Sequence, residues 1–368
     1  MPPKPEGKKG KVKENLAMLN HCDIHLKNLK RGLTSTKANT QAIEPFIKKV
    51  DEKLKAITNP QDPDLDVPVF PCFVHERMEF DTCMTLFNAF TADGNVYPWL
   101  RQVSLYHCHI GDEGAMVVAD FIRNYTPEPS KNPFGIELLE LPENDISAKG
   151  AQYLGRMLAQ NETVKTLILD FNPLGDDGVG LLGDGLKWNS TLEVLSMQHC
   201  DVGPEGGELI GKYIVRSSSV KNLSVRGNPL GPHGVTHIAR SLAKNAYLEE
   251  LDLADTSFGI DLVAIEALRD GIEGNESLTA VDLNFNSLVP AGVQLLLEML
   301  KPKHKITKFV LFERISEVVF KEVIDTLQNN QKMMKKKKKK GKAAPAAPPP
   351  EEGADAPPPP PPDAAAAA

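Results

Sequence analysis

The sequence lacks several features that would place it outside the cytoplasm. No apolar run approaches the roughly 18 residues that a membrane-spanning helix needs, so no membrane insertion is expected. The first residues, MPPKPEGKKGK, are basic, but no apolar stretch follows them, and a secretory signal is not expected. The five cysteines are odd in number and scattered, which favours reduced thiols over a disulfide framework. Together these absences predict a cytoplasmic protein.

The sequence also lacks a motif for catalysis or nucleotide binding. It contains neither a G-x-x-x-x-G-K-[ST] phosphate loop nor a G-x-S-x-G nucleophile elbow, and no carboxylate pair stands out as acid and base. Gly178, Gly180 and Gly183 match G-x-G-x-x-G by letters alone, because a long turn separates them from the preceding strand pattern. We therefore predict that the protein is not an enzyme and binds no cofactor.

Charge is unevenly distributed along the chain. The formal net charge is −7, yet residues 332–342 carry eight lysines and no acid. An acidic body therefore lies between a basic start and a basic run near the end. Such a run favours a polyanion, such as RNA, acidic lipid or the glutamate-rich tails of tubulin; a solvated tail without a partner is the alternative. The candidate polyanion-binding residues are Lys335, Lys336, Lys337, Lys338, Lys339 and Lys340.

A repeat dominates the sequence from residue 100 onward. The frame LxxLxLxxNxL recurs, and its starts at residues 136, 164, 192, 220 and 248 are each 28 residues apart. In every unit the L-x-L alternation predicts a short strand, and apolar residues at helical spacing follow it. The ninth position, Asn or Cys in most units, is expected to bond buried loop backbone. An Asn shortly before the next strand is expected at a left-handed helix C-cap.

Two histidine–cysteine segments are candidates for a zinc site. His107-Cys108-His109 and His199-Cys200 occupy the same columns of different units. Three strand spacings, roughly 14 Å, separate them, so one zinc ion cannot use both. We predict no metal site, and we interpret both cysteines as small residues of the buried ninth column.

These repeats resemble the ribonuclease-inhibitor class of leucine-rich repeats over about residues 100–315. The resemblance implies an α/β horseshoe with parallel strands inside and helices outside. Such a stack needs caps at both ends. The predicted organisation is a basic disordered tail (1–13), an amphipathic helical hairpin (14–57), a linker and N-terminal cap (58–99), the repeat domain with a C-terminal capping helix (100–331), and a disordered Lys-rich, then Ala/Pro-rich tail (332–368). The hairpin either packs on the horseshoe end or binds a partner.

Strand alternation places one set of side chains opposite the core leucines, on the concave face. Carboxylates and exposed aromatics alternate there, a combination that suits a basic protein surface; an ordinary solvated sheet face is the alternative. The candidate protein-binding residues are Tyr106, Glu140, Glu143, Asp170, Phe171, His199, Arg226, Asp252, Asp255, Asp282, Asn284 and Phe285.

We therefore expect a non-enzymatic protein–protein interaction scaffold. Short chains of this class with flanking helices and charged tails resemble components of ciliary and flagellar axonemes, which implies tubulin or axonemal partners rather than nucleic acid. The alternative is a regulator of a small GTPase, since RanGAP-like activators share this repeat type. Those activators present an arginine from an early repeat turn, whereas the first turns here have none and Arg226 is the only arginine on the concave face.

Overall fold

The computed structural model describes residues 8–35, 44–62, 72–91, 100–125, 135–311 and 315–342. Among these residues, no helix is both long and apolar enough to cross a membrane. The strands are β1 (Cys72–Val74), β2 (Gln102–Leu105), β3 (Leu138–Glu140), β4 (Thr166–Ile168), β5 (Val194–Ser196), β6 (Asn222–Ser224), β7 (Glu250–Asp252), β8 (Ala280–Asp282) and β9 (Lys308–Val310). The helices are α1 (Lys8–Ser35), α2 (Glu44–Lys55), α3 (Phe80–Ala89), α4 (Gly111–Asn124), α5 (Ala148–Leu158), α6 (Gly175–Leu186), α7 (Pro204–Arg216), α8 (Gly231–Leu242), α9 (Leu262–Gly274), α10 (Pro290–Leu300) and α11 (Glu317–Lys342).

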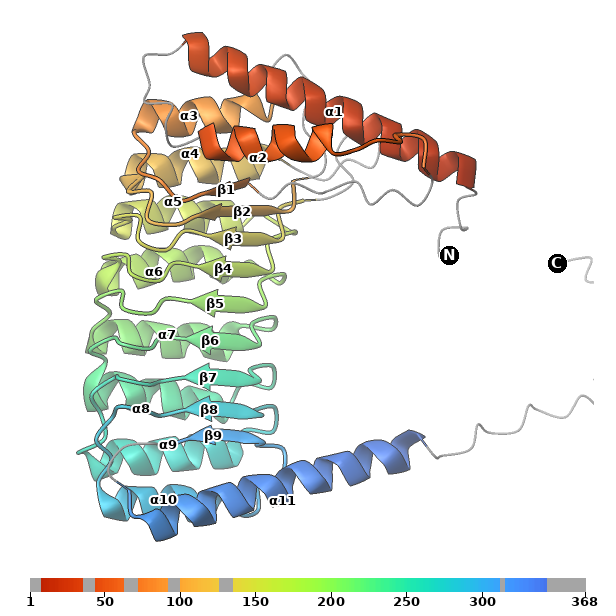
Figure 1. Cartoon of the computed structure of the whole chain (residues 1–368). Coiled ribbons are helices and arrows are strands. Elements are labelled where there is room, and N and C mark those ends of the chain that lie inside the picture. The colour runs from red at the N-terminus through yellow and green to blue at the C-terminus, as the bar shows by residue number, and fades with distance from the viewer. Residues whose placement is uncertain are drawn as a thin grey trace, which may run out of the picture.

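The described residues form one sheet of nine parallel strands in the order of the chain, β1 to β9. From β1 onward, a helix follows each strand, and Figure 1 shows these helices stacked along one side of the sheet. The predicted α/β leucine-rich-repeat horseshoe is confirmed. We call the side of the sheet that these helices leave uncovered the open sheet face; it is the concave face predicted from the sequence.

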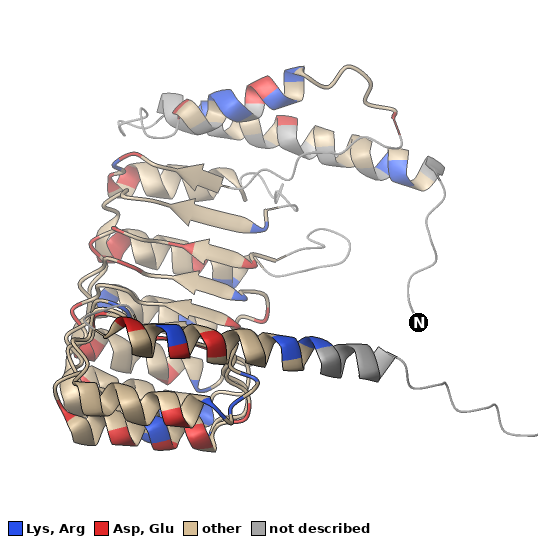
Figure 2. Ribbon diagram, turned by 60° about the horizontal axis from the view of Figure 1, so that its bottom comes forward, with Lys and Arg blue, Asp and Glu red and all other residues tan. Residues whose placement is uncertain are grey.

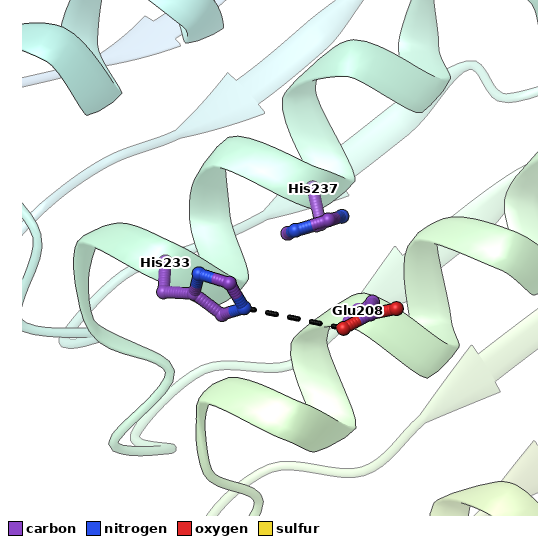
Figure 3. A group of neighbouring side chains, drawn as sticks. All are labelled: Glu208, His233 and His237. Carbon is purple, nitrogen blue, oxygen red and sulfur yellow. Dashed lines mark ion pairs between the residues drawn. The ribbon is translucent and has the colours of Figure 1, made fainter.

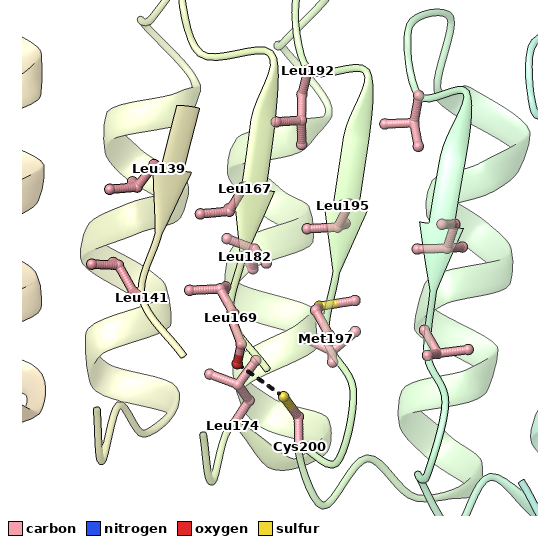
Figure 4. Packing of buried hydrophobic residues seen from close by; sticks show 14 of the residues in the cluster. Leu139, Leu141, Leu167, Leu169, Leu174, Leu182, Leu192, Leu195, Met197 and Cys200 are labelled. Atoms are coloured by element: carbon pink, nitrogen blue, oxygen red, sulfur yellow. Dashed lines mark hydrogen bonds between the residues drawn. The ribbon is translucent and has the colours of Figure 1, made fainter. Parts of the chain in front are cut away.

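Leucine ladders hold neighbouring repeats in register. Leu139 lies opposite Leu167, and Leu167 lies opposite Leu195. All three are at most 1% exposed, and Figure 4 shows them directed into the space between strands and helices. Burial of each such side chain contributes about 2 kcal/mol. One unit cannot bury its own apolar face, so the stacked units stabilise one another.

The asparagines of the ninth column form a second ladder, as expected. Asn172 is 1% exposed. Its Oδ1 accepts hydrogen bonds from the N–H groups of Asn144 and Ile146, each at 3.0 Å. Its Nδ2 donates to the carbonyls of Leu141 and Leu169, each at 2.8 Å. One side chain therefore satisfies buried backbone groups of two successive repeats.

The asparagines before the strands do not adopt the left-handed conformation expected from the sequence. Asn275 has a φ of −88°. Asn189 instead donates from Nδ2 to the Leu158 carbonyl at 2.8 Å and accepts at Oδ1 from the Leu192 N–H at 2.8 Å. Asn189 thus ties the end of the preceding repeat's helix, α5, to the segment that leads into β5, and this bonding makes a left-handed cap unnecessary.

The predicted N-terminal cap is a complete strand–helix unit. Cys72 and Val74 of β1 pair with Val103 and Leu105 of β2, so β1 extends the sheet by one strand. The repeat frame did not reveal this unit because none of its frame positions holds a leucine, and Arg77 stands in the ninth column in place of Asn or Cys.

The N-terminal helices pack on this end of the repeat stack. Helix α1 contacts α2 and α3, and α2 contacts β1. Leu26 and Ile47 are buried in the common core. Helix α1 begins at Lys8, so the part of the basic tail from residue 8 to 13 is helical rather than disordered; the four lysines there are compatible with a helix.

At the other end, α11 closes the stack and continues beyond it. Val323 is buried, and Asn330 donates to the Ile306 carbonyl at 3.0 Å. The sequence predicted disorder from residue 332, but α11 extends to Lys342, because Gln, Met and Lys all favour helix. Figure 2 shows basic residues toward the projecting end of this helix. Residues 343–368 lie outside the described residues.

Close helix packing depends on glycines of α6. A Cβ added at Gly185 would lie 1.8 Å from the Gly155 carbonyl oxygen, whereas one added at Gly183 meets nothing within 4 Å. Gly178, Gly180 and Gly183 all lie inside this helix. They therefore do not form the loop before a helix that a dinucleotide-binding motif requires.

We expect Gly185→Ala to lower the free energy of unfolding by about 2–3 kcal/mol, because the added methyl group forces two backbones apart. Gly183→Ala, two residues away in the same helix, should raise it by up to about 1 kcal/mol through helix propensity. Urea denaturation followed by circular dichroism measures both. Equal effects of the two substitutions would contradict the observed helix spacing.

Candidate protein-binding surface

In the loops that leave β2 to β8, the residue in one shared column adopts a left-handed backbone, and further left-handed residues follow it. It is Phe171 (φ +60°) after β4, Gly227 (φ +69°) after β6 and Phe285 (φ +59°) after β8. This conformation costs a non-glycine residue about 1–2 kcal/mol. The two phenylalanines are nevertheless 52% and 49% exposed. Their rings therefore return little burial energy to the fold, which indicates a role in contact with another molecule.

Each exposed phenylalanine lies against a polar neighbour of the next or preceding repeats. The Phe171 ring stacks on His199, with centroids 4.8 Å apart and planes 10° from parallel. The Arg226 guanidinium lies 5.7 Å from the centroid of Phe285, and its Nη1 is 3.8 Å from Asp252 Oδ2. The arrangement of Arg226, Phe285 and Asp252 shows that a cation fits between an aromatic face and a carboxylate on this surface.

Two carboxylates oppose one another on neighbouring strands of the open sheet face. Asp252 on β7 lies in register with Asp282 on β8. Burial raises the pKa of Asp252, and the charge of Asp282 raises it further. Hydrogen bonds from the Ala254 N–H at 3.0 Å and the Ser224 hydroxyl at 3.1 Å act in the opposite direction. Like charges in direct register destabilise a sheet, so this pair also indicates a function outside folding.

Asp170 forms a second half-buried carboxylate site beside Phe171. It accepts hydrogen bonds from the Ser196 hydroxyl at 2.6 Å and the Gln198 N–H at 2.8 Å. Burial nevertheless raises the pKa of Asp170. A cation placed nearby would lower this pKa by offsetting the unfavourable burial of the negative charge.

The carboxylates of the central strands border a hollow of about 270 Å³ on the open sheet face. It extends from β5 to β9, so it runs along the stack rather than into it. Its polar lining consists of Ser196, Gln198, Asn222, Ser224, Glu250, Asp252, Asp282 and Lys308. An extended segment of a partner protein fits such a shallow channel better than a compact small molecule does.

At the amino-terminal end, Tyr106 and Glu140 form a hydrogen-bonded group. The Ser104 hydroxyl donates to Glu140 Oε2 at 2.5 Å, and the Tyr106 hydroxyl donates to Oε1 at 3.3 Å. Burial and then the charge of Glu140 raise the pKa of Tyr106. His107 Nδ1 lies 2.7 Å from Glu143 Oε2 at the exposed loop end.

Two further aromatic residues of this region, Phe73 and His75, were not predicted from the sequence. Phe73 on β1 is 42% exposed, and its ring lies 6.0 Å from that of Tyr106. His75 stacks on Tyr106 with centroids 6.3 Å apart. The period-2 pattern of Cys-Phe-Val at residues 72–74 was the available signal, since it places Phe73 opposite the two buried neighbours.

All twelve predicted residues lie in strands of the sheet or in the loops that directly follow them, but they form separate groups. One group surrounds Tyr106 and Glu140, a second surrounds Phe171, and a third joins Arg226 to Phe285. Asn284 belongs to the third group, because its N–H donates to Asp282 Oδ1 at 3.0 Å. Asp255 is exposed in the left-handed loop position next to this group.

The cysteines of the two His–Cys segments contribute to packing. Cys108 and Cys200 are fully buried, and burial raises the pKa of each thiol to about 12. The Cys200 thiol donates to the Leu169 carbonyl at 3.2 Å. Both cysteines therefore behave as the small residues of the ninth column that the sequence predicted. Among the described residues, a group of three potential metal ligands lies elsewhere, on α7 and α8.

We expect Asp282→Asn to raise the free energy of unfolding at pH 7 by about 0.5 kcal/mol, because it removes the like charge opposite Asp252. The pKa of Asp252 is raised in the folded state, so its ionised carboxylate destabilises the fold at pH values above this raised pKa. This destabilisation is lost as the pH falls toward 3.8, the ordinary pKa of an aspartate, because Asp252 then becomes protonated. The gain should therefore vanish near pH 4. Urea denaturation at both pH values, with Asp184→Asn on the outer helix α6 as control, measures it; an equal gain at both would contradict the repulsion.

Family comparison agrees with this architecture. A model described as "Leucine Rich repeat" matches residues 98–119, 160–183 and 189–211. The chain contains leucine-rich repeats. Proteins built from such repeats generally provide surfaces for protein–protein interaction. No curated protein matches the sequence.

Solved structures align with parts of the chain. Actin-binding site 2 of leiomodin-1 aligns with a TM-score of 0.36 and 11% identity over 53% of this chain and 95% of that chain. The tropomodulin C-terminal domain of Caenorhabditis elegans aligns with a TM-score of 0.36 and 17% identity over 43% and 93%. Rad7 in the yeast complex with Elc1 aligns with a TM-score of 0.26 and 15% identity over 61% and 73%.

Proposed function

We propose that this leucine-rich-repeat protein is a non-enzymatic scaffold whose open sheet face binds a basic segment of a partner protein. The observation that carries the proposal is the pair of exposed phenylalanines, Phe171 and Phe285, held in a disfavoured backbone conformation among carboxylates. The left-handed turn belongs to the repeat, because the same column is left-handed in the other repeats, but the exposure of the two rings does not stabilise the fold. Burial of these rings against a partner would be favourable.

The contacts of the two phenylalanines indicate where the partner's cation lies. Arg226 already lies over Phe285 and beside Asp252. None of the ion pairs among the described residues involves Asp170, which lies next to Phe171. An arginine or lysine of the partner would therefore occupy the Asp170–Phe171 site in the same manner, with the rest of the basic segment along the hollow.

A peptide-binding experiment tests the proposal on the full chain. The fluorescence anisotropy of a labelled Arg-rich peptide is measured on addition of protein, with a Glu-rich peptide of equal length as the ligand control. We expect Asp170→Asn to weaken binding of the basic peptide at least fivefold, and Asp184→Asn on α6 to leave it within twofold. If the two substitutions weakened binding equally, the peptide would be held by nonspecific attraction to the acidic chain and not at the Asp170–Phe171 site.

For the basic end of α11, we infer a second contact, with an acidic polymer. Lys335–Lys340 lie in the sequence of this helix, whose end projects beyond the last repeat (Figure 1). Tubulin tails within a ciliary or flagellar axoneme are the proposed target, supported by this charge and by the resemblance noted above. Co-sedimentation with microtubules should disappear when proteolysis removes the tubulin tails, and immunolocalisation exclusively outside cilia would rule out the axoneme.

Regulation of a small GTPase remains the competing hypothesis, and it depends on Arg226. The guanidinium of this residue is engaged by Asp252 and Phe285 rather than presented to a partner. This arrangement favours the scaffold. A GTP-hydrolysis assay with small GTPases, repeated with Arg226→Ala, separates the two, because only an activator would stimulate turnover and lose the stimulation with the substitution.

A further inference from the structure

Three potential metal ligands meet on the outer helices, away from the open sheet face. His233 and His237 lie on α8, and Glu208 lies on α7; one ligand atom of each falls within 4.8 Å of the others. Figure 3 shows the two imidazoles and the carboxylate directed toward a common space between the helices. His233 Nε2 is 4.0 Å from Glu208 Oε2, and the two imidazole centroids are 4.7 Å apart.

Helical periodicity explains the pairing of the histidines. Residues four apart lie on the same face of a helix, one turn above the other. The pair His233-x-x-x-His237 therefore presents two imidazoles side by side, the spacing by which a single helix supplies two zinc ligands in other proteins. The third ligand comes from α7, the preceding repeat's helix.

Glycines fix the backbone spacing across this group. A Cβ added at Gly207 would lie 2.5 Å from Gly234 Cα, and one added at Gly211 would lie 2.8 Å from the His237 carbonyl oxygen. Helices α7 and α8 therefore approach as closely as their backbones allow, and this approach brings Glu208 within reach of the histidines. The backbone positions are set by packing, while the ligand side chains keep rotamer freedom.

The electrostatics of the group favour a cation. A hydrogen bond and the charge of Lys212 lower the pKa of Glu208, so the carboxylate is ionised at neutral pH. Lys212 Nζ lies 2.7 Å from Glu208 Oε1 and is 63% exposed. A metal ion would displace this flexible ammonium into solvent at little cost, because exposed ion pairs contribute only about 0–1 kcal/mol.

We propose that Glu208, His233 and His237 form a Zn²⁺ site that joins α7 to α8 and so clamps two successive repeats. Imidazole nitrogens and a carboxylate oxygen are ligands that zinc prefers, and three protein ligands leave the fourth position to water. Tetrahedral bonds of about 2.0–2.1 Å require ligand atoms about 3.3 Å apart. Rotation of the partly exposed side chains closes the remaining gap. The spacing of His233 and His237 was the available sequence signal, but the third ligand comes from a different repeat and was not predicted.

Zinc titration of the full chain tests the proposal. The protein is stripped with a chelator, and ZnSO₄ is added in competition with a chromophoric zinc indicator. We expect His233→Asn and His237→Asn each to weaken binding of one Zn²⁺ equivalent at least tenfold. Lys212→Met should strengthen it severalfold, because Glu208 is then free. Zinc at a hundredfold excess over its dissociation constant should also raise the unfolding midpoint by about 5 °C.

Matched variants locate the site. Glu205→Gln, one turn earlier on α7, and His109→Asn, in the loop between β2 and α4, should keep the wild-type zinc affinity. All of these residues are at least partly exposed, and the midpoint measured in chelator establishes that each variant folds. Wild-type affinity in both His233→Asn and His237→Asn would overturn the proposal. Loss of binding in His109→Asn alone would also overturn it, since the ion would then lie beside His107.

Discussion

Asn172→Ala is expected to lower the free energy of unfolding by about 4 kcal/mol, one of the two largest effects that the structure predicts. The substitution removes both acceptor bonds from the N–H groups of Asn144 and Ile146 and both donor bonds to the carbonyls of Leu141 and Leu169. Each buried group left without a partner costs about 1–3 kcal/mol. Denaturation in urea measures the loss.

Cys200→Ala provides the matched control in the same column of the next repeat. The Cys200 side chain is equally buried, but its thiol makes only weak hydrogen bonds, to the carbonyls of Leu169 and Gln198. We expect a loss of about 1 kcal/mol. If Asn172→Ala were no more destabilising than Cys200→Ala, the asparagine ladder would not be the element that joins the repeat turns.

The second large effect concerns binding. The double substitution Phe171→Gly, Phe285→Gly is expected to weaken binding of the basic peptide about a hundredfold, because it removes both aromatic anchors. The fold should tolerate it, since glycine prefers the left-handed conformation and Gly227 already occupies this position in another repeat. Fluorescence anisotropy measures the affinity, and thermal unfolding measures the stability.

An exposed aromatic residue on the opposite side supplies the control. Trp188 is 80% exposed at the end of α6, and Trp188→Ala should leave peptide affinity within twofold. If Trp188→Ala weakened binding as much as the double substitution does, the peptide would have no preference for the open sheet face. A double variant that binds normally would assign the phenylalanines no role in recognition.

The repeat period was sufficient to predict much of the architecture. A step of 28 residues assigns every leucine to a column, so the ladder through Leu139, Leu167 and Leu195 and the buried role of Asn172 both follow from sequence. Alternation likewise assigns Asp252 and Asp282 to one face of the sheet. It does not show that repulsion between the two carboxylates destabilises the folded state.

Features that depend on contacts between columns were not accessible in this way. The left-handed backbone of Phe171 arises from the turn that the repeats share. The conformational preference of phenylalanine itself would predict a negative φ at this position. The β1–α3 unit has no leucines in frame, and the helical part of the lysine run was hidden by its low complexity. Glu208 meets His233 only because glycines bring α7 and α8 together.

Site-specific photo-crosslinking tests the binding role of the open sheet face most directly. A photoreactive phenylalanine analogue is placed at position 171 or at position 188, and the full chain is irradiated with the Arg-rich peptide. The account predicts a covalent adduct at position 171 that Asp170→Asn reduces, and none at position 188. Adducts of equal yield at both positions, or at position 188 alone, would contradict it.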